Sequence, residues 1–553
     1  MTTPRTCPPG RRAATGRRRR RGLCVSAAVA LLGALAACGG RPDRDTAGGP
    51  SNRLLVIGYD REPDTMNRFA THILEDIQSC IIEPLVVADD SMRLVPVLAA
   101  EVPTPANGGV RLRADGGMDV TWRLRPGIRW HDGVPFTSAD LKFTVDAIND
   151  PAWNPESTDG FDRIASVDTP DSLTAVLHYR ERYAPYALQF VRGALPRHVL
   201  AGQDLDRHAY NRAPLGTGPY RLAEWKTGEY ILLERVPDYW RGPAAIERLQ
   251  FRFIPSATTR VTQLAAGEIH LIPFLPWDLH RDVTRLPGIV VQRTLGNGYE
   301  HVSLNQRRIE AFRDVRVRRA LWHAIDRPML VRTVLDGLAP VVDGAIQPMS
   351  WAYAADAVGP TFDPARAAAL LDSAGWRDTD GDGVRDRDGR PLAFTLMTSA
   401  GFVTREQVAQ ALVAQWQAIG VAARITLVDG TAIASRWFSG DFDAFLHWWQ
   451  MPADPELTLF FAKDRTPPAG RNINYLADDS LTTLLYRSDA EIDQARRRAL
   501  LVAAQHRLVA LAPEIPLYNT SKLDAVPAGL RGFRGNPTNS GPFWNVHQWT
   551  FDR

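Results

Sequence analysis

Residues 120–140 read VTWRLRPGIRWHDGVPFTSAD and combine signals for a strand, two turns and a helix. The segment from Val120 to Leu124 is rich in β-forming residue types and predicts a strand. The PG and DG pairs that follow predict two turns. TSAD then matches a capping box, so a helix should start after Thr137 and run to about Ile148. A strand, two turns and a helix in close succession indicate a mixed α/β chain.

The same alternation extends along most of the sequence. Further strands are predicted over residues 54–59, 221–225, 230–234 and 249–254. Helices are predicted over residues 258–266, 314–335, 364–374, 404–419 and 490–512. The helix predictions rest on the helical spacing of apolar residues, on N-cap residues and on terminal glycines. Because strands alternate with helices throughout, we expect α/β lobes.

Length and composition set the number of domains. The chain has 553 residues, 45% of them hydrophobic and 23% charged, which is a globular balance. That length is too great for one ordinary core, so two or three domains are expected. After the N-terminal region no run of 18 uncharged apolar residues occurs, so no later segment is expected to span a membrane.

The N-terminal region has the order of parts of an export signal. An arginine-rich segment without acidic residues precedes an apolar run over residues 23–35, and LAAC occupies residues 35–38. This LAAC resembles a bacterial lipobox, which predicts that residues 1–37 are removed as a lipoprotein signal peptide and that Cys38 is acylated. Residues 38–50 would then form a flexible tether. The alternatives are an ordinary signal peptide cleaved near Ala37 and a short membrane anchor.

Removal of the predicted signal peptide also changes the net charge and the number of cysteines. It takes away eight arginines, leaving 57 basic against 62 acidic residues, a net formal charge of −5 in place of +3. A mildly acidic body makes a nucleic-acid partner unexpected. Cys7 and Cys24 leave with the signal peptide and Cys38 would carry lipid, so Cys80 remains alone. No intramolecular disulfide is then possible, and we expect Cys80 to be a buried thiol.

No concentrated catalytic signature is present. The sequence lacks the H-E-x-x-H, G-x-S-x-G and G-x-x-x-x-G-K-[ST] motifs. His131 and Asp132 are adjacent, but neighbouring residues of a strand point to opposite faces, so a turn is the better interpretation. We therefore expect no enzyme. An exported hydrolase remains an alternative, because catalytic triads are defined by geometry and not by sequence order.

One acidic segment follows a metal-binding template. Residues 378–386 read DTDGDGVRD and place Asp378, Asp380, Asp382 and Asp386 at relative positions 1, 3, 5 and 9 of a calcium loop, with a glycine at 6. The twelfth position, which should be a bidentate glutamate, is Gly389. The segment is either a weak structural calcium site or an acidic, solvated turn, and no other cofactor is expected.

The chain has 15 tryptophans, and two of them are adjacent at Trp448 and Trp449. They follow the apolar segment FDAFL and precede the loop PADP, which places them at the end of a predicted strand. Aromatic side chains offer a large contact area with little loss of entropy, so this pair is a candidate for a ligand cleft. The alternative is that one ring packs inward while the other caps the loop.

Several segments together resemble one protein family. They are LRPGIRWHDG (124–133) with PFTSAD (135–140), PLGTGPY (214–220) with ERVPDYW (234–240), DVRVRRAL (314–321), AIDR (324–327) and IPLY (515–518). In this order they are similar to family 5 extracellular solute-binding proteins, the oligopeptide- and dipeptide-binding components of ABC importers. Each segment alone is a weak signal, but the set extends over nearly the whole chain after residue 50.

The resemblance implies an α/β, two-lobed periplasmic-binding-protein-like fold (type II) with an extra subdomain in the first lobe. The first lobe would comprise residues 51–84, 196–295 and 519–553, the extra subdomain 85–195 and the second lobe 296–518. A peptide or related solute would bind between the lobes and be delivered to the permease of an ABC transporter. The protein would be a monomer outside the cytoplasmic membrane, in the periplasmic space or at the cell surface, anchored to that membrane through Cys38.

The resemblance also identifies ligand-binding candidates. In peptide-binding relatives an aspartate after the tryptophan pairs with the α-amino group of the peptide, and the aligned position here is Met451. A buried ammonium without a carboxylate is costly. Either Asp454 substitutes for the missing aspartate, or the ligand is a blocked peptide, a sugar, an opine-like compound or another solute. The expected ligand-binding residues are Trp448, Trp449, Asp454 and Tyr299. A non-transport receptor or chaperone on the same scaffold is a further alternative.

Overall fold

The computed structural model describes residues 50–71, 76–158 and 160–552. The predicted signal peptide, Cys38 and all but the last residue of the predicted tether lie outside the described residues. Within the described part of the chain, no helix is both long and apolar enough to cross a bilayer.

The first lobe is built on a four-stranded sheet of order β1-β10-β9-β8. Its strands are β1 (Leu54–Tyr59), β8 (Tyr220–Lys226), β9 (Tyr230–Arg235) and β10 (Arg248–Phe253). β1 is parallel to β10, and the other neighbours are antiparallel. Gly228 occupies the hairpin turn between β8 and β9 at φ +75°, a region that favours glycine. These strands confirm the predicted ones.

Shorter elements complete this lobe. They are α1 (Asp76–Ser79), β2 (Val86–Ala88), β3 (Leu94–Pro96), α3 (Arg197–Leu200), α4 (Ala257–Ala265), α5 (His280–Thr284), β11 (Ile289–Thr294), β19 (Lys522–Pro527), β20 (Leu530–Arg531) and β21 (Thr550–Phe551). α4 confirms the helix predicted over residues 258–266. Cys80 is fully buried in the core, as expected.

An antiparallel sheet of order β4-β5-β7-β6 contains residues 120–123, the start of the stretch quoted first in the sequence analysis. Its strands are β4 (Val110–Leu112), β5 (Met118–Arg123), β6 (Ile164–Asp171) and β7 (Thr174–Tyr179). Helix α2 (Ser138–Ile148) packs against β6 and β7. The predicted capping box is confirmed, because the backbone N–H of Thr137 donates to Asp140 Oδ2 over 2.9 Å.

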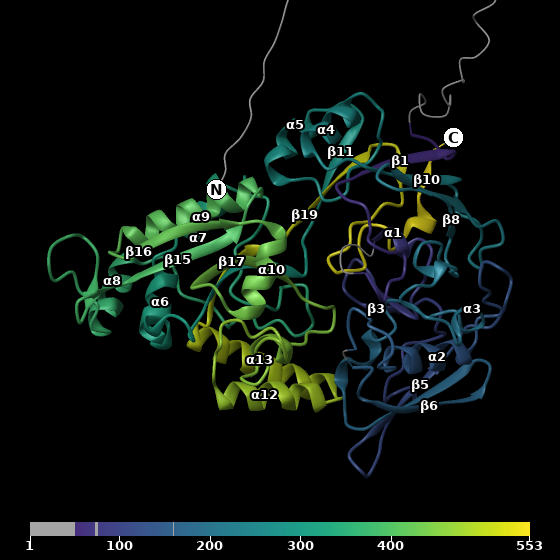
Figure 1. The fold of residues 1–553 in the computed structure, drawn as a ribbon, viewed down its shortest axis with the longest axis horizontal. Coiled ribbons are helices and arrows are strands. Elements are labelled where there is room, and N and C mark those ends of the chain that lie inside the picture. The colour runs from purple at the N-terminus through teal and green to yellow at the C-terminus, as the bar shows by residue number, and fades with distance from the viewer. Residues whose placement is uncertain (1–49, 72–75, 159, 553) are drawn as a thin grey trace, which may run out of the picture. The chain divides into compact units, whose positions relative to one another are not determined.

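The second lobe has a five-stranded mixed sheet of order β16-β15-β17-β12-β18. Its strands are β12 (Gly298–Leu304), β15 (Ala393–Ser399), β16 (Ala422–Val428), β17 (Ala444–Gln450) and β18 (Glu514–Asn519). β15 runs parallel to β16 and β17, whereas β12 is antiparallel to β17 and β18. Helix α9 (Val403–Gln417) packs against β15 and β16, as Figure 1 shows.

The remaining elements of this lobe are mostly helical. They are α6 (Val315–His323), α7 (Arg327–Thr333), α8 (Pro364–Ser373), β13 (Asp386–Arg387), β14 (Arg390–Pro391), α10 (Gly430–Ser439), α11 (Thr458–Phe461), α12 (Asp479–Ala490) and α13 (Gln494–Leu511). The prediction of one helix over residues 314–335 is wrong, because α6 ends at His323 and α7 begins anew. Asp326 caps α7 by accepting the N–H of Met329, and Pro328 has no N–H with which to continue a helix.

The chain passes twice between the two lobes. β11 pairs with β19 in the first lobe, and the neighbouring strands β12 and β18 pair in the second-lobe sheet. The two crossing segments are therefore residues 295–297 and 520–521. They touch closely, since a Cβ on Gly296 would lie 2.4 Å from the carbonyl oxygen of Thr520. The fold is thus a two-lobed α/β architecture, while the residue ranges assigned to the lobes from sequence stay a prediction.

Candidate ligand cavity between the lobes

A cavity of about 580 Å³ lies between the lobes. The first lobe contributes Tyr59, Asp60, Arg61, Asp76, Phe274 and Lys522, and the second contributes Glu300, Phe402, Arg405, Trp448 and Gln450. The crossing residues Thr520 and Ser521 also line it. Its volume falls in the range of sites for small ligands, roughly 300–1,000 Å³. Contacts from both lobes to one bound molecule are therefore possible.

Three large aromatic side chains expose their rings at this cavity. Phe274 is 39% exposed, Phe402 58% and Trp448 47%. Aromatic rings left in water around a concave site are typical of binding surfaces. Phe274 also has a φ of +53°, which is uncommon for a bulky residue, and its N–H donates to Asp524 Oδ1 over 3.1 Å. Backbone strain of this kind concentrates at ligand sites.

The alternation of β17 separates the two predicted tryptophans. Trp448 and Gln450 line the cavity, whereas Trp449 lies on the other face of the strand. The Trp449 ring packs inside the second lobe, 5.1 Å from the ring of Phe460. Met451 is also buried in that interior and has no surface in the cavity. Of the predicted pair, the structure therefore places Trp448 alone at the cavity.

Two other predicted residues do not line this cavity. Tyr299 is fully buried, and its hydroxyl donates to Glu514 Oε1 over 2.5 Å. Asp454 pairs with Arg497 over 2.7 Å and lines a second cavity of about 690 Å³. This cavity also lies between the lobes, because Arg93 and Tyr186 line it from outside the second lobe. Burial raises the pKa of Asp454, against the opposing charge of Arg497. Asp454 therefore lies outside the 580 Å³ cavity and is paired with Arg497, and its role at a ligand stays a prediction.

Most charged groups of the cavity wall are already paired with each other. Glu300 and Arg405 form a bidentate pair at 2.7 and 3.2 Å, and each side chain is only about a tenth exposed. Two further pairs, Glu156–Arg192 at 2.7 Å and Asp60–Arg61 at 2.9 Å, also line the cavity. Such internal pairing leaves these groups little excess charge to offer a ligand.

Lys522 differs from these residues. Its Nζ donates to the carbonyl oxygens of Asn536 at 3.1 Å and Thr538 at 2.7 Å. Among the residues that the structure describes, no carboxylate forms an ion pair with it. Burial lowers the pKa of Lys522 to about 8, although Asp76 and Asp524 oppose this. Sequence reasoning missed Lys522, although lysine is rare here: the chain contains only four.

The acidic loop has the geometry of a compact turn. Asp378, Asp380 and Asp382 are exposed, with one carboxylate oxygen of each within 4.8 Å of the others. Their oxygens accept backbone N–H groups within the loop, including those of Gly381 and Gly383. The fourth candidate, Asp386, instead accepts the N–H and hydroxyl of Thr379. These bonds account for the loop without an ion, and calcium binding stays a prediction.

A buried cluster in the second lobe contains the residue types of a hydrolase. Ser303 Oγ lies 3.1 Å from His447 Nε2 and 3.3 Å from His301 Nε2, which is 3.4 Å from Glu514 Oε2. Each of the four residues is at most 6% exposed, and none lines the interlobe cavity. Burial lowers the pKa of both histidines, that of His301 to about 3, so they remain neutral. A nucleophile without access to substrate does not favour hydrolysis.

Two lobes joined by two crossings, with an aromatic cavity between them, define the class of two-lobed binding proteins. The chain belongs to the bacterial extracellular solute-binding proteins, family 5: the sequence model described as "Bacterial extracellular solute-binding proteins, family 5 Middle" matches residues 93–466. This confirms the family and the fold class expected from the sequence.

Individual relatives agree with this assignment. The chain is 27% identical over 548 residues to the oligopeptide-binding protein AppA of Bacillus subtilis, covering 95% of this chain and 98% of AppA. It is 25% identical to the glutathione-binding protein GsiB of Shigella boydii, covering 80% and 84%. The structure of B. subtilis AppA with a nonapeptide superposes with a TM-score of 0.76 at 25% identity, covering 92% of this chain and all of AppA. These relatives are binding proteins and not enzymes.

Proposed function

We propose that this chain is a lipid-anchored, extracytoplasmic receptor that encloses a peptide or related small solute between its lobes and delivers it to the permease of an ABC importer. The observation that carries this proposal is the interlobe cavity, whose exposed aromatic rings come from both lobes. The described ligands of relatives, an oligopeptide for AppA and glutathione for GsiB, support a peptide-like solute.

The mechanism is closure of the two lobes around the ligand. A ligand that contacts Phe274 on one lobe and Trp448 on the other stabilises the arrangement in which both walls are close. The crossing segments 295–297 and 520–521 are short and connect the lobes, so they are the places where backbone rotation would open the cavity. Binding and release need no covalent step.

Native mass spectrometry of the protein purified from its own membranes tests the ligand class. We expect a co-purified peptide or related solute that is lost on partial unfolding and raises the melting temperature when it is added back. X-ray scattering should then show a smaller radius of gyration with ligand than without it. A bound solute that leaves the radius of gyration unchanged would contradict closure, and turnover of the solute would contradict a pure receptor.

Two cellular experiments test the anchor and the delivery. Cys38→Ser should abolish incorporation of a radiolabelled fatty acid and release the protein from the membrane fraction. Disruption of the neighbouring permease should abolish uptake of the co-purified solute. Uptake that persists without the permease would favour the non-transport receptor or chaperone.

A further inference from the structure

Lys522 is a cation in the wall of the interlobe cavity whose protein partners are neutral. An ammonium group has three N–H donors. The carbonyl oxygens of Asn536 and Thr538 accept two of them, and no described residue accepts the third. Lys522 is therefore a cation of the wall without a directly paired carboxylate, although the charges of Asp76 and Asp524 act on it at longer range. The arginines of the wall, Arg61, Arg192 and Arg405, all have carboxylate partners.

The surroundings of Lys522 restrict what could pair with it. Its Nζ lies 6.0 Å from the centre of the Phe274 ring, and that exposed ring faces the same cavity. A ligand that places an anionic group at Nζ would therefore also bring its body against an aromatic surface. The carboxylate of Asp76, which also lines the cavity, accepts the hydroxyl of Tyr59 over 2.8 Å.

We infer that the ligand carries a carboxylate group, and that Lys522 binds this carboxylate through the ammonium N–H that the protein leaves unused. This inference rests on the proposed function, because it concerns the same cavity. A carboxylate would pair with the cation in a partly desolvated site, where charge-assisted hydrogen bonds are strong. The group could be the C-terminus of a peptide or an acidic side chain.

Tripeptide libraries in three forms test the inference. The first has free C-termini and no acidic side chains, the second has amidated C-termini and no acidic side chains, and the third has amidated C-termini and one glutamate. Each is passed over the immobilised wild-type protein, and retained peptides are quantified by mass spectrometry. We expect the first or the third library to be retained at least tenfold over the second, and the choice between them identifies the source of the carboxylate.

Two variants separate this role from a structural one. Lys522→Met keeps the apolar stem but removes the cation. The ratio of retained carboxylate-bearing peptides to retained peptides of the second library should then fall to near one. Lys463→Met is the matched control, because Lys463 is exposed and pairs with Asp479 outside the cavity. If Lys522 only holds the loop that contains Asn536 and Thr538, Lys522→Met will weaken retention of all three libraries equally, and the inference fails.

The remaining outcomes are equally decisive. Equal retention of all libraries by the wild type overturns the carboxylate inference and leaves the proposed function standing. No retention of any library overturns the inference together with the peptide part of the proposed function.

If Lys522→Met does not fold, a pH series on the wild type replaces it. The carboxylate preference should then fall as pH rises above about 8, where Lys522 beside Asp76 and Asp524 loses its proton; a constant preference would overturn the inference.

Discussion

At the scale of residues, the adjacent tryptophans show how one position along a strand changes the role of a side chain. Trp448 presents its ring to the cavity, and Trp449 packs within the second lobe. The sequence indicated that the pair lies at a strand end, but not which ring faces the cavity. That choice depends on which face of β17 the second-lobe interior covers.

The two tryptophans should therefore respond differently to truncation. Trp448→Ala should weaken retention of the wild type's preferred peptides by about tenfold to a hundredfold, because a contact surface is lost. Its free energy of unfolding should change little, since the ring is 47% exposed. Trp449→Ala is the matched control and should lower the free energy of unfolding by about 3 kcal/mol through a core cavity. Urea unfolding and peptide retention measure the two effects, and the reverse pattern would contradict the assignment.

The Glu300–Arg405 pair makes a second prediction at this scale. Arg405→Met leaves the carboxylate of Glu300, which is about a tenth exposed, without its partner. Breaking a buried pair in this way costs about 3–5 kcal/mol. The double variant Glu300→Met with Arg405→Met removes both charges and should recover much of that loss. Urea unfolding of the three proteins tests this, and a double variant no more stable than Arg405→Met would contradict it.

The sequence analysis identified only some of the residues that line the cavity. Trp448 was identified from local signals, namely a predicted strand followed by a loop. Phe274 and Lys522 lie in segments without any motif, and they become site residues only because the chain folds them against the second lobe. Tyr299 and Asp454 do not line the 580 Å³ cavity, because they pair with Glu514 and Arg497, which are distant in sequence.

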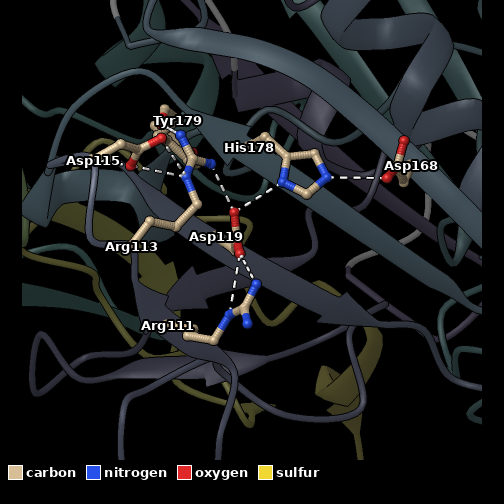
Figure 2. Close-up of polar contacts among 8 residues, drawn as sticks. Arg111, Arg113, Asp115, Asp119, Asp168, His178 and Tyr179 are labelled. Carbon is tan, nitrogen blue, oxygen red and sulfur yellow. Dashed lines mark hydrogen bonds and ion pairs between the residues drawn. The ribbon is translucent and has the colours of Figure 1, made fainter.

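At the scale of elements, the sheet β4-β5-β7-β6 carries a polar network centred on Asp119, which Figure 2 shows. Its two oxygens accept from Arg111 at 2.7 Å, Arg113 at 2.8 Å and His178 at 2.8 Å. His178 also contacts Asp168 over 3.1 Å, so the network joins all four strands. Although partial burial opposes it, these hydrogen bonds lower the pKa of Asp119 to about 2.

This network predicts a dependence of stability on acid. Because the folded-state pKa of Asp119 lies below its ordinary value, its contribution is present above about pH 4 and is lost as the pH falls towards 2. With allowance for the exposure of Arg111, we expect about 1–2 kcal/mol. Asp119→Asn should remove that contribution at pH 7 and make unfolding less sensitive to acid in this window. Equal acid sensitivity of wild type and variant, measured by urea unfolding from pH 2 to 7, would contradict the role of Asp119.

Helix boundaries show what local rules can and cannot establish. The capping box at Thr137 was readable from four residues, and the structure confirms it. The break between α6 and α7 was missed, although Asp326 and Pro328 are the ordinary signals of a new helix start. The apolar stripe of the two helices continues past the break because both pack against the same core.

At the scale of the whole molecule, the two crossing segments connect the lobes and lie against each other. Gly296→Ala would place a Cβ 2.4 Å from the carbonyl oxygen of Thr520, so the segments must separate. We expect a loss of about 1–3 kcal/mol in unfolding free energy and a larger radius of gyration in the ligand-bound state. Gly344→Ala is the matched control, because a Cβ there meets no atom within 4 Å. If Gly296→Ala leaves the radius of gyration of the ligand-bound state unchanged, closure does not require close contact between the two segments.

The alternating α/β pattern and the family were readable from the sequence, because they depend on local residue types and on motifs in order, and the signal peptide stays a prediction. The set of side chains that meet at the cavity depends instead on the tertiary structure. Phe274, Glu300, Trp448 and Lys522 come from four separate segments, and their approach depends on strand pairing and core packing across hundreds of residues. No local pattern carries that information, since each pairing is stabilised by contacts with residues far away in the chain.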